Sequence, residues 1–397
     1  MQTTVPAVDV KLAAEGVVFE VESLYAALAG LTDRRHARGI RHTLVHVLVY
    51  LLLAKLAGQD RLSGIADWVK YRQETLAQLL GLSRPRAPSL NTYRRVLGQY
   101  IDIEEFERVV RDFFAALPGA STSRERALDG KTLRGTIVTG QMQGRHLLAV
   151  FLPSEGWVEL QVEVGSHENE ISAAPGVLKS LDLQGKVVTG DAIFAQRDLS
   201  QQIVEASGDY VWTVKDNQPT LRQDLEVAFQ SEPTSKGFSP TPKAIRSART
   251  IEKGHGREEQ RILRVTADLN GYLDWPGVQQ VFQLERHIRR TGDGHVSHEV
   301  VYGISSLTAA EASPEQLLAF NRGHWAIENG LHYRRDETLR EDWCHLKCGN
   351  APWAMAVINN LIIGLVLHLK RKNLPATRRY FDSHPQEAQW LVLRRLS

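Results

Sequence analysis

The sequence predicts an α/β protein in which an all-helical N-terminal module precedes a mixed β-sheet that carries a strand-rich insertion. Two observations support this division. From residue 21 to about residue 118, apolar residues recur three or four positions apart, which is the spacing of amphipathic helices. After the Pro-Gly-Ala-Ser-Thr-Ser stretch at 118–123, short apolar runs bounded by turn residues predict strands.

The helical module, residues 21–118, follows residues 1–20, which are predicted to form a flexible leader. The apolar stretch 43–57 is shorter than the ~20 residues of a membrane span and contains His46 and Lys55, so we expect a buried helix there. Ser89 is predicted to cap a helix over 91–99 that carries Arg94 and Arg95. This arginine pair is consistent with a DNA-docking helix or with an ordinary solvent-facing helix surface.

The sheet is predicted from seven segments in the order strand, strand, strand, helix, strand, helix, strand. They lie at 126–129, 146–152, 156–164, 171–181, 186–191, 196–207 and 210–215. Three consecutive strands with polar turns favour an antiparallel meander, whereas the later strand–helix–strand repeats require parallel crossovers. This is the element order of ribonuclease-H-like domains, in which the first and fourth strands are neighbours. Asp129 and Asp191, at the ends of these two strands, are therefore predicted to lie side by side.

The rest of the chain completes a second domain over residues 124–369. Between about 219 and 310 the pattern is irregular and strand-rich, which predicts an insertion. A helical pattern resumes at 314 and runs through Glu328 to about 339. A last apolar helix at 354–369 precedes a basic C-terminal tail, residues 370–397.

Net charge and cysteine content set limits on the partners and the compartment of the protein. The net charge of +2 does not by itself indicate a nucleic-acid-binding protein, but arginines cluster at 34–41 and at 84–95. Solvated helix faces account equally well for any single cluster. Cys344 and Cys348 are too few for a disulfide framework, which fits a reducing cytosol. With His345 they offer fewer than the four ligands of a structural zinc site, so incidental cysteines are the preferred interpretation.

Three isolated acids are the candidate catalytic residues and metal ligands: Asp129, Asp191 and Glu328. Paired carboxylates repel each other, and a hard divalent cation with oxygen ligands removes that conflict. We expect the three acids to converge on a metal site that cuts and joins DNA. A turn role for each Asp and a surface salt bridge for Glu328 are the simpler alternatives.

Basic and amide residues around these acids are candidate DNA contacts. Loop capping by the amides and a hairpin turn at 254–257 would explain some of them without DNA. The candidates, besides Arg94 and Arg95, are Lys131, Arg134, Lys215, Asn217, Gln218, His255, Arg257, Arg322, His324 and Arg335.

Five segments in order resemble bacterial insertion-sequence transposases of the DDE type, in the branch that includes the H-repeat-associated proteins of Rhs elements. The segments are Asp-Gly-Lys-Thr-Leu-Arg-Gly at 129–135, Gly-Asp-Ala at 190–192, the stretch 209–218, Gly-His-Gly-Arg at 254–257 and the stretch 322–332. The resemblance runs from about residue 24 to 369. The helical module is similar to the associated domain of that branch.

The resemblance implies a ribonuclease-H-like catalytic core in which Asp129, Asp191 and Glu328 hold two Mg²⁺ or Mn²⁺ ions. One ion would activate water or a 3′-hydroxyl, and the other would stabilise the leaving oxygen. The implied partners are double-stranded DNA, as terminal inverted repeats and target, and a second copy of the chain, in the bacterial cytosol or nucleoid. The superfamily's Tyr-Arg-Glu-Lys signature falls on Asn321, His324, Glu328 and Arg335, where only the glutamate is identical.

Two alternatives stay open. A domesticated relative would cut DNA with a divalent metal without joining ends. A non-catalytic DNA-binding remnant would use the acids only to stabilise its fold.

Overall fold

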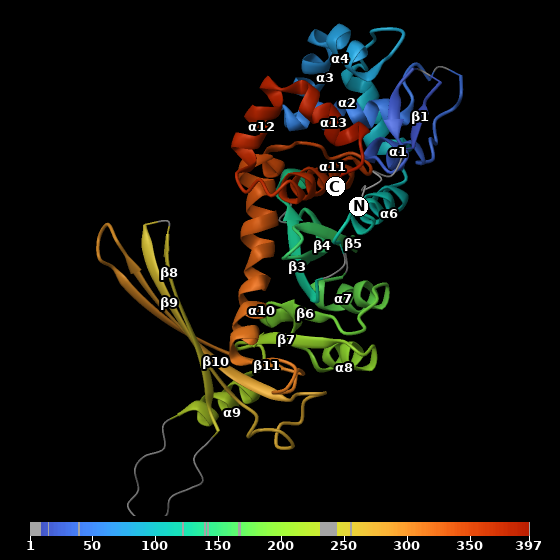
Figure 1. Ribbon diagram of the computed structural model, residues 1–397. Coiled ribbons are helices and arrows are strands. Elements are labelled where there is room, and N and C mark those ends of the chain that lie inside the picture. The colour runs from blue at the N-terminus through green and yellow to red at the C-terminus, as the bar shows by residue number, and fades with distance from the viewer. Residues whose placement is uncertain are drawn as a thin grey trace, which may run out of the picture.

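The computed structural model describes residues 9–14, 16–38, 40–120, 123–138, 140, 143–165, 168–230, 244–254 and 256–396. A helical module lies at one end of the molecule, a nine-stranded sheet forms the middle, and a long β-ribbon projects from the far side of the sheet (Figure 1). The protein is therefore a mixed α/β protein with a helical N-terminal region, as the sequence predicts.

Three helices of the helical module begin at a residue whose side chain caps the helix N-terminus. The side-chain oxygens of Ser23, Ser89 and Asp102 accept hydrogen bonds from backbone N–H groups three residues further along. The helices are α1 (Leu24–Ala29), α2 (Leu44–Leu56), α3 (Leu62–Tyr71), α4 (Gln73–Leu80), α5 (Leu90–Arg95) and α6 (Ile103–Ala115). Helix α2 is buried almost throughout, which confirms the prediction made from its composition.

The two ends of the chain are more ordered than the sequence predicts. Strands β1 (Val10–Leu12) and β2 (Val18–Glu20) pair in an antiparallel hairpin, so the prediction of a flexible leader is wrong for this part, while residues 1–8 lie outside the described residues. The predicted basic tail folds into helices α12 (Leu374–Ser383) and α13 (Pro385–Leu393). Asn373 caps α12, and proline in the first turn of each helix suits a helix start.

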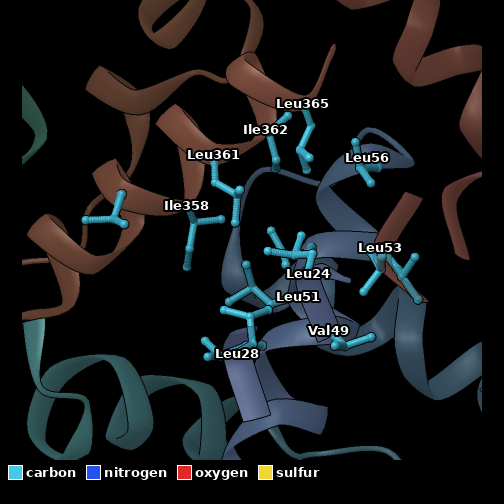
Figure 2. Packing of buried hydrophobic residues seen from close by; sticks show 14 of the residues in the cluster. Leu24, Leu28, Val49, Leu51, Leu53, Leu56, Ile358, Leu361, Ile362 and Leu365 are labelled. Carbon is cyan, nitrogen blue, oxygen red and sulfur yellow. The ribbon is translucent and has the colours of Figure 1, made fainter. Parts of the chain in front are cut away.

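One hydrophobic core joins both ends of the chain. Helix α11 (Ala351–His368) packs against α1 and α2, with Ile358, Leu361 and Ile362 facing Leu24 and Leu51 (Figure 2). By length and composition α11 could cross a membrane, but 83% of it is buried within the protein. Helices α11 to α13 therefore complete the core of the N-terminal module, across the boundary predicted at 118–124.

The central sheet has the predicted connectivity. Strands β3 (Glu125–Leu133), β4 (Arg145–Leu152) and β5 (Trp157–Val164) form an antiparallel meander, and β6 (Val187–Gly190) and β7 (Asp209–Val214) follow in parallel. The first and fourth strands, β3 and β6, are neighbours, which confirms that prediction. Helices α7 (Glu170–Lys179) and α8 (Arg197–Glu205) cover one face (Figure 1).

The later strands continue the same sheet. After α9 (Pro219–Phe229), strands β8 (Arg246–Gly254), β9 (Arg257–Thr266), β10 (Gln280–Arg290) and β11 (Val296–Ser305) pair antiparallel, and β11 joins β7. Only Tyr302–Ser305 of β11 pairs with β7, so the outer halves of these strands extend beyond the core as the ribbon in Figure 1.

Helix α10 (Pro314–Ala326) lies on the sheet face opposite α7 and α8 (Figure 1). It contacts β3 and β6 and continues into π-helical turns at Ile327–His332 and Arg334–Thr338.

A buried polar network fixes these turns to the sheet. Arg335 is fully buried, and its Nε and Nη2 atoms lie 2.8 Å from the Glu341 carboxylate. Its Nη1 donates to Gln161 of β5 over 3.0 Å, and Asn359 of α11 donates to Glu341 over 2.8 Å. Burial alone would raise the pKa of Glu341, but Arg335 holds it below its usual value. The prediction that Arg335 contacts DNA is wrong, because no part of its side chain reaches solvent.

Replacement of Arg335 tests this scaffold role. Arg335→Met should lower the free energy of unfolding by about 3–5 kcal/mol, because Glu341 would remain buried without its counter-charge. Urea denaturation without DNA measures the loss. The double variant Arg335→Met/Glu341→Leu should recover much of it, since both charges are then absent. Normal stability of the single variant would contradict a scaffold role.

Glu107 on α6 is a second buried group at the contact between helical module and sheet. Its Oε1 accepts hydrogen bonds from Trp353 over 2.7 Å and from Gln161 over 3.1 Å. The residue keeps some exposed surface, but its carboxyl end is enclosed, and this burial raises its pKa to about 8. In the folded protein Glu107 is therefore protonated at neutral pH.

This raised pKa predicts a pH-dependent stability. Below the unfolded-state pKa near 4.5, Glu107 is protonated in both states and has no effect. As pH rises towards 8 the unfolded state releases its proton first, so the folded state loses stability. At pH 8 the free energy of unfolding of Glu107→Gln, measured by denaturant titration, should therefore exceed that of the parent protein by about 1 kcal/mol or more. This difference should vanish near pH 4. A difference independent of pH would contradict the assignment.

Candidate active site

The two aspartates of the candidate site are brought together by strand register. In the parallel pair β3–β6, Leu128 lies opposite Gly190, so Asp129 and Asp191 are the next residues on adjacent strands. Asp191 directly follows the end of β6 and begins a short 3₁₀ turn over Ala192–Phe194. The sequence prediction that these acids are neighbours is confirmed by this register.

Glu328 joins them from the helix on the opposite face. It lies in the π-helical turn that follows α10. Burial raises the pKa of Glu328, and the negative charges of Asp129 and Asp191 raise it further. The three carboxylates therefore occupy one electrostatic neighbourhood. Among the described residues, the group whose ligand atoms all lie within 4.8 Å of one another is elsewhere, at Glu285, His287 and His298, so these three acids are more widely spaced.

The pKa values of the two aspartates are shifted in opposite directions. Burial raises the pKa of Asp129 to about 6, with a further contribution from the charge of Glu170. Burial also acts on Asp191, but the Ala192 backbone N–H and the Lys215 ammonium outweigh it and lower its pKa. The Nζ atom of Lys215 lies 3.0 Å from Asp191 Oδ1. Lys215 thus already neutralises part of the charge that a cation would meet here.

Two histidines stand beside Asp129. His324 is among the charges that act on both Asp129 and Asp191, and burial lowers its pKa. The Nε2 atom of His332 lies 3.1 Å from Asp129 Oδ2, but their geometry is not that of a hydrogen bond. Burial lowers the pKa of His332 to about 3, so its ring is neutral. Because His332 follows Glu328 by four residues on one helix, its position was readable from the spacing.

An acidic side chain missed by the sequence analysis approaches Asp129 from α7. Gly130 permits this approach, because a Cβ at that position would lie 2.0 Å from Glu170 Oε1 and 2.6 Å from His146 Nε2. Nε2 of His146 and Oε1 of Glu170 are hydrogen-bonded over 2.7 Å. The sequence offered no signal for this pair, since Glu170 directly precedes the helix predicted at 171–181 and His146 begins a predicted strand.

Three of the predicted DNA contacts have hydrogen-bond partners within the protein. Lys131, buried on β3, donates to Asp336 over 2.6 Å and so ties that strand to the π-helical turns. The Asn217 side chain donates to the Ala192 carbonyl over 2.6 Å, and Gln218 donates to Ala195 over 3.0 Å. These amides hold the loop after Asp191, which is the loop-capping alternative.

The remaining candidates lie nearer the surface. Arg134 is largely exposed, with Nε 3.8 Å from Asp342. Arg322 pairs with Glu252 at 2.6 Å, and Arg257 lies 3.4 Å from Glu259. His255 lies outside the described residues.

The arginine clusters of the helical module meet at one concave surface of about 520 Å³. Arg95 of α5 lies on this surface, where it donates to Tyr100 over 2.7 Å. Arg35, Arg38 and Arg41 line the same hollow, so the 34–41 cluster and Arg95 form one basic surface, in which Arg35 is already paired with Asp33. Arg94, the other predicted contact on α5, is exposed.

The donor set fits divalent metal ions. The three acids supply only carboxylate oxygens, the ligands that Mg²⁺ and Mn²⁺ prefer. Burial raises the pKa of both Asp129 and Glu328, and the charges of neighbouring carboxylates raise each further, so a bound cation would favour their ionised forms.

Two family models match the chain. Residues 120–365 match the family described as the transposase DDE domain, and residues 25–114 match the DDE_Tnp_1-associated family. Two proteins of Escherichia coli (strain K12), YbfL and the H repeat-associated protein YhhI, which carries a transposase name, are each 28% identical over 88% of this chain and 92% of their own length.

An uncharacterized protein from the dhlA 3′ region of Xanthobacter autotrophicus is 33% identical over 70% of this chain and 91% of its own length. A more distant comparison is structural. The piggyBac transposase, in a synaptic complex with hairpin DNA, matches 93% of this chain and 77% of its own, with a TM-score of 0.41 and 13% identity.

The family match covers well over half of the chain and includes all three acids of the site. The chain therefore belongs to the DDE transposases, metal-dependent enzymes of the polynucleotidyl transferase and endonuclease type, in the branch of the H repeat-associated proteins.

Proposed function

We propose that this transposase binds terminal inverted repeats of an insertion sequence, cleaves the DNA strand at each end and transfers it to target DNA. Asp129, Asp191 and Glu328 would be the catalytic carboxylates. The observation that carries the proposal is the register of β3 and β6, which sets Asp129 beside Asp191 under the helix that carries Glu328. The strand order around them supports a ribonuclease-H-like core.

The three carboxylates would hold two Mg²⁺ or Mn²⁺ ions, which when bound supply Lewis-acid activation of the attacking hydroxyl and stabilisation of the leaving oxygen. The protein's own residues orient the reaction. Lys215, half exposed beside Asp191, would contact a phosphate oxygen. His332 lies against Asp129 and limits the directions that its carboxylate can take. Asn217 and Gln218 fix the loop of Asp191.

Double-stranded DNA would also contact the helical module. The basic hollow formed by Arg35, Arg38, Arg41 and Arg95 suits a phosphate backbone better than separate surface arginines do. Two element ends must meet during transposition, so we propose a homodimer on DNA, acting in the bacterial cytosol or nucleoid. In this proposal the module recognises DNA and the sheet performs the chemistry.

Removal of one catalytic carboxylate tests the proposal. Asp191→Asn should reduce cleavage of DNA carrying the element's inverted repeat, with Mg²⁺, by about a thousandfold or more, because a metal ligand loses its charge. Gel-shift affinity for the same DNA should remain within about twofold, since the change leaves the basic hollow intact. Asp198→Asn, an exposed Asp at the start of α8, is the matched control and should keep activity.

The same assay separates the alternatives. Cleavage without strand joining by the parent protein would indicate a domesticated endonuclease. Undiminished function of Asp191→Asn would indicate that the acids serve only the fold.

His332→Gln tests the role of the histidine. Both ring nitrogens of His332 lack hydrogen-bond partners, so the change should cost little folding stability. If His332 orients Asp129, the variant should need roughly ten times more Mg²⁺ for half-maximal cleavage, because a residue that supports a metal ligand tunes metal affinity. His368→Gln on α11 is the control. Equal metal dependence in both variants would contradict the role.

A further inference from the structure

A second cluster of metal-ligating side chains lies on the β10–β11 ribbon. Glu285 and His287 occupy one face of β10, and His298 of β11 stands directly opposite His287 in the register. The potential ligand atoms of these three residues all lie within 4.8 Å of one another. Neither the reaction of the three catalytic acids nor the family resemblance involves this cluster.

The distances suit coordination better than hydrogen bonding. Nε2 of His287 lies 3.5 Å from Glu285 Oε2, and Nε2 of His298 lies 3.8 Å from the same oxygen. Both separations exceed an ordinary hydrogen bond. Ligand atoms bound tetrahedrally at about 2.0–2.1 Å from zinc are separated by about 3.3–3.4 Å. The two histidine–glutamate separations exceed this value by only a few tenths of an ångström, and the ligand atoms of the two histidines lie within 4.8 Å of each other.

A neighbouring side chain already orients Glu285, whereas one of the two stacked imidazole rings must turn before both ring planes contain the same ion. The imidazole rings of His287 and His298 stack with centroids 4.3 Å apart and planes 16° from parallel. Arg264 of β9 donates to the other carboxylate oxygen, Oε1 of Glu285, and leaves Oε2 facing the histidines. Such outer partners fix the direction of metal ligands. Both imidazoles are partly exposed, so an ion can enter from solvent.

The cluster is separate from the catalytic centre because strand residues alternate between faces. Arg286, between the two β10 ligands, lies on the other face, where its guanidinium is 5.6 Å from the centroid of Trp325 near the end of α10. Glu259 and Glu299 bind Arg286 on that face. The three ligands therefore lie on the ribbon face turned away from the helix that carries Glu328.

We propose that Glu285, His287 and His298 form a binding site for one transition-metal ion, with Zn²⁺ as the best-fitting species and solvent completing the coordination. Two imidazoles and one carboxylate favour Zn²⁺ over Mg²⁺, which prefers oxygen ligands. The ion would bridge β10 and β11 in the outer half of the ribbon, where buried apolar contacts are few. It would hold the ribbon rigid without taking part in strand cleavage.

Zinc binding by the untagged full-length protein tests the site. Competition with a chromophoric chelator should reveal one Zn²⁺ per chain at this site. His298→Ala and Glu285→Gln should each weaken that binding by about tenfold or more, because each removes a ligand. Cobalt substitution should give the visible absorption of a four-coordinate ion in the parent protein and not in these variants. Hydrogen exchange of the outer β10 and β11 amides should slow when Zn²⁺ is added.

Matched variants exclude other sources of binding. His295→Ala removes an exposed histidine in the same hairpin and should leave Zn²⁺ affinity unchanged. Cys344→Ser/Cys348→Ser should also retain the site, since these cysteines lie on another part of the chain. Asp191→Asn should keep Zn²⁺ binding while losing cleavage, so this proposal stands or falls independently of the catalytic one. Equal Zn²⁺ affinity in the parent, His298→Ala and Glu285→Gln proteins, or no saturable binding, would overturn it.

Discussion

The buried ion pair between Arg335 and Glu341 is the constraint on which the geometry of the site depends. Glu328 lies in a π-helical turn, whereas Asp129 lies on β3 and Asp191 directly follows β6, so local structure alone does not keep the three together. Arg335 connects the helical turns to Gln161 on β5, and Lys131 connects β3 to Asp336 on the same turns. Buried charges tolerate little displacement, because separating them leaves each uncompensated. The network therefore sets where Glu328 stands relative to the strands.

The same fold leaves the acids themselves poorly compensated. Raised pKa values at Asp129 and Glu328 follow from burial and mutual repulsion, and Lys215 relieves only Asp191. Glu170 adds a further negative charge beside Asp129, through the space left by Gly130. Repulsion between these carboxylates destabilises the protein without a bound ion. It also favours cation binding, because a bound cation removes the repulsion. Structural rigidity at Arg335 and electrostatic conflict at Asp129 are thus complementary parts of one site.

Sequence patterns predicted the strand order and the meeting of Asp129 with Asp191, because period, turn residues and crossover rules fix sheet topology. They misjudged Arg335, which is seven residues from Glu328 and would share its face on a regular α-helix. The chain forms π-helical turns at 327–332 and 334–338, which turn less per residue, so that spacing no longer holds. Glu170 and His146 were missed because only tertiary packing brings them to Gly130. The folded structure of the two chain ends was also missed, because the residues they pack against are distant in sequence.

The hydrophobic core that α11 to α13 share with the helical module determines how the basic hollow is oriented relative to the three acids. Helix α11 joins the network through Asn359, which donates to Glu341, and packs between the helical module and the sheet. Glu107 of α6 reaches the same network through Gln161. A basic hollow carried on this module therefore keeps a fixed orientation to the acids, unlike one on a flexible linker. If DNA is held at that hollow, its path to the active site is set by packed side chains rather than by diffusion of a tethered domain.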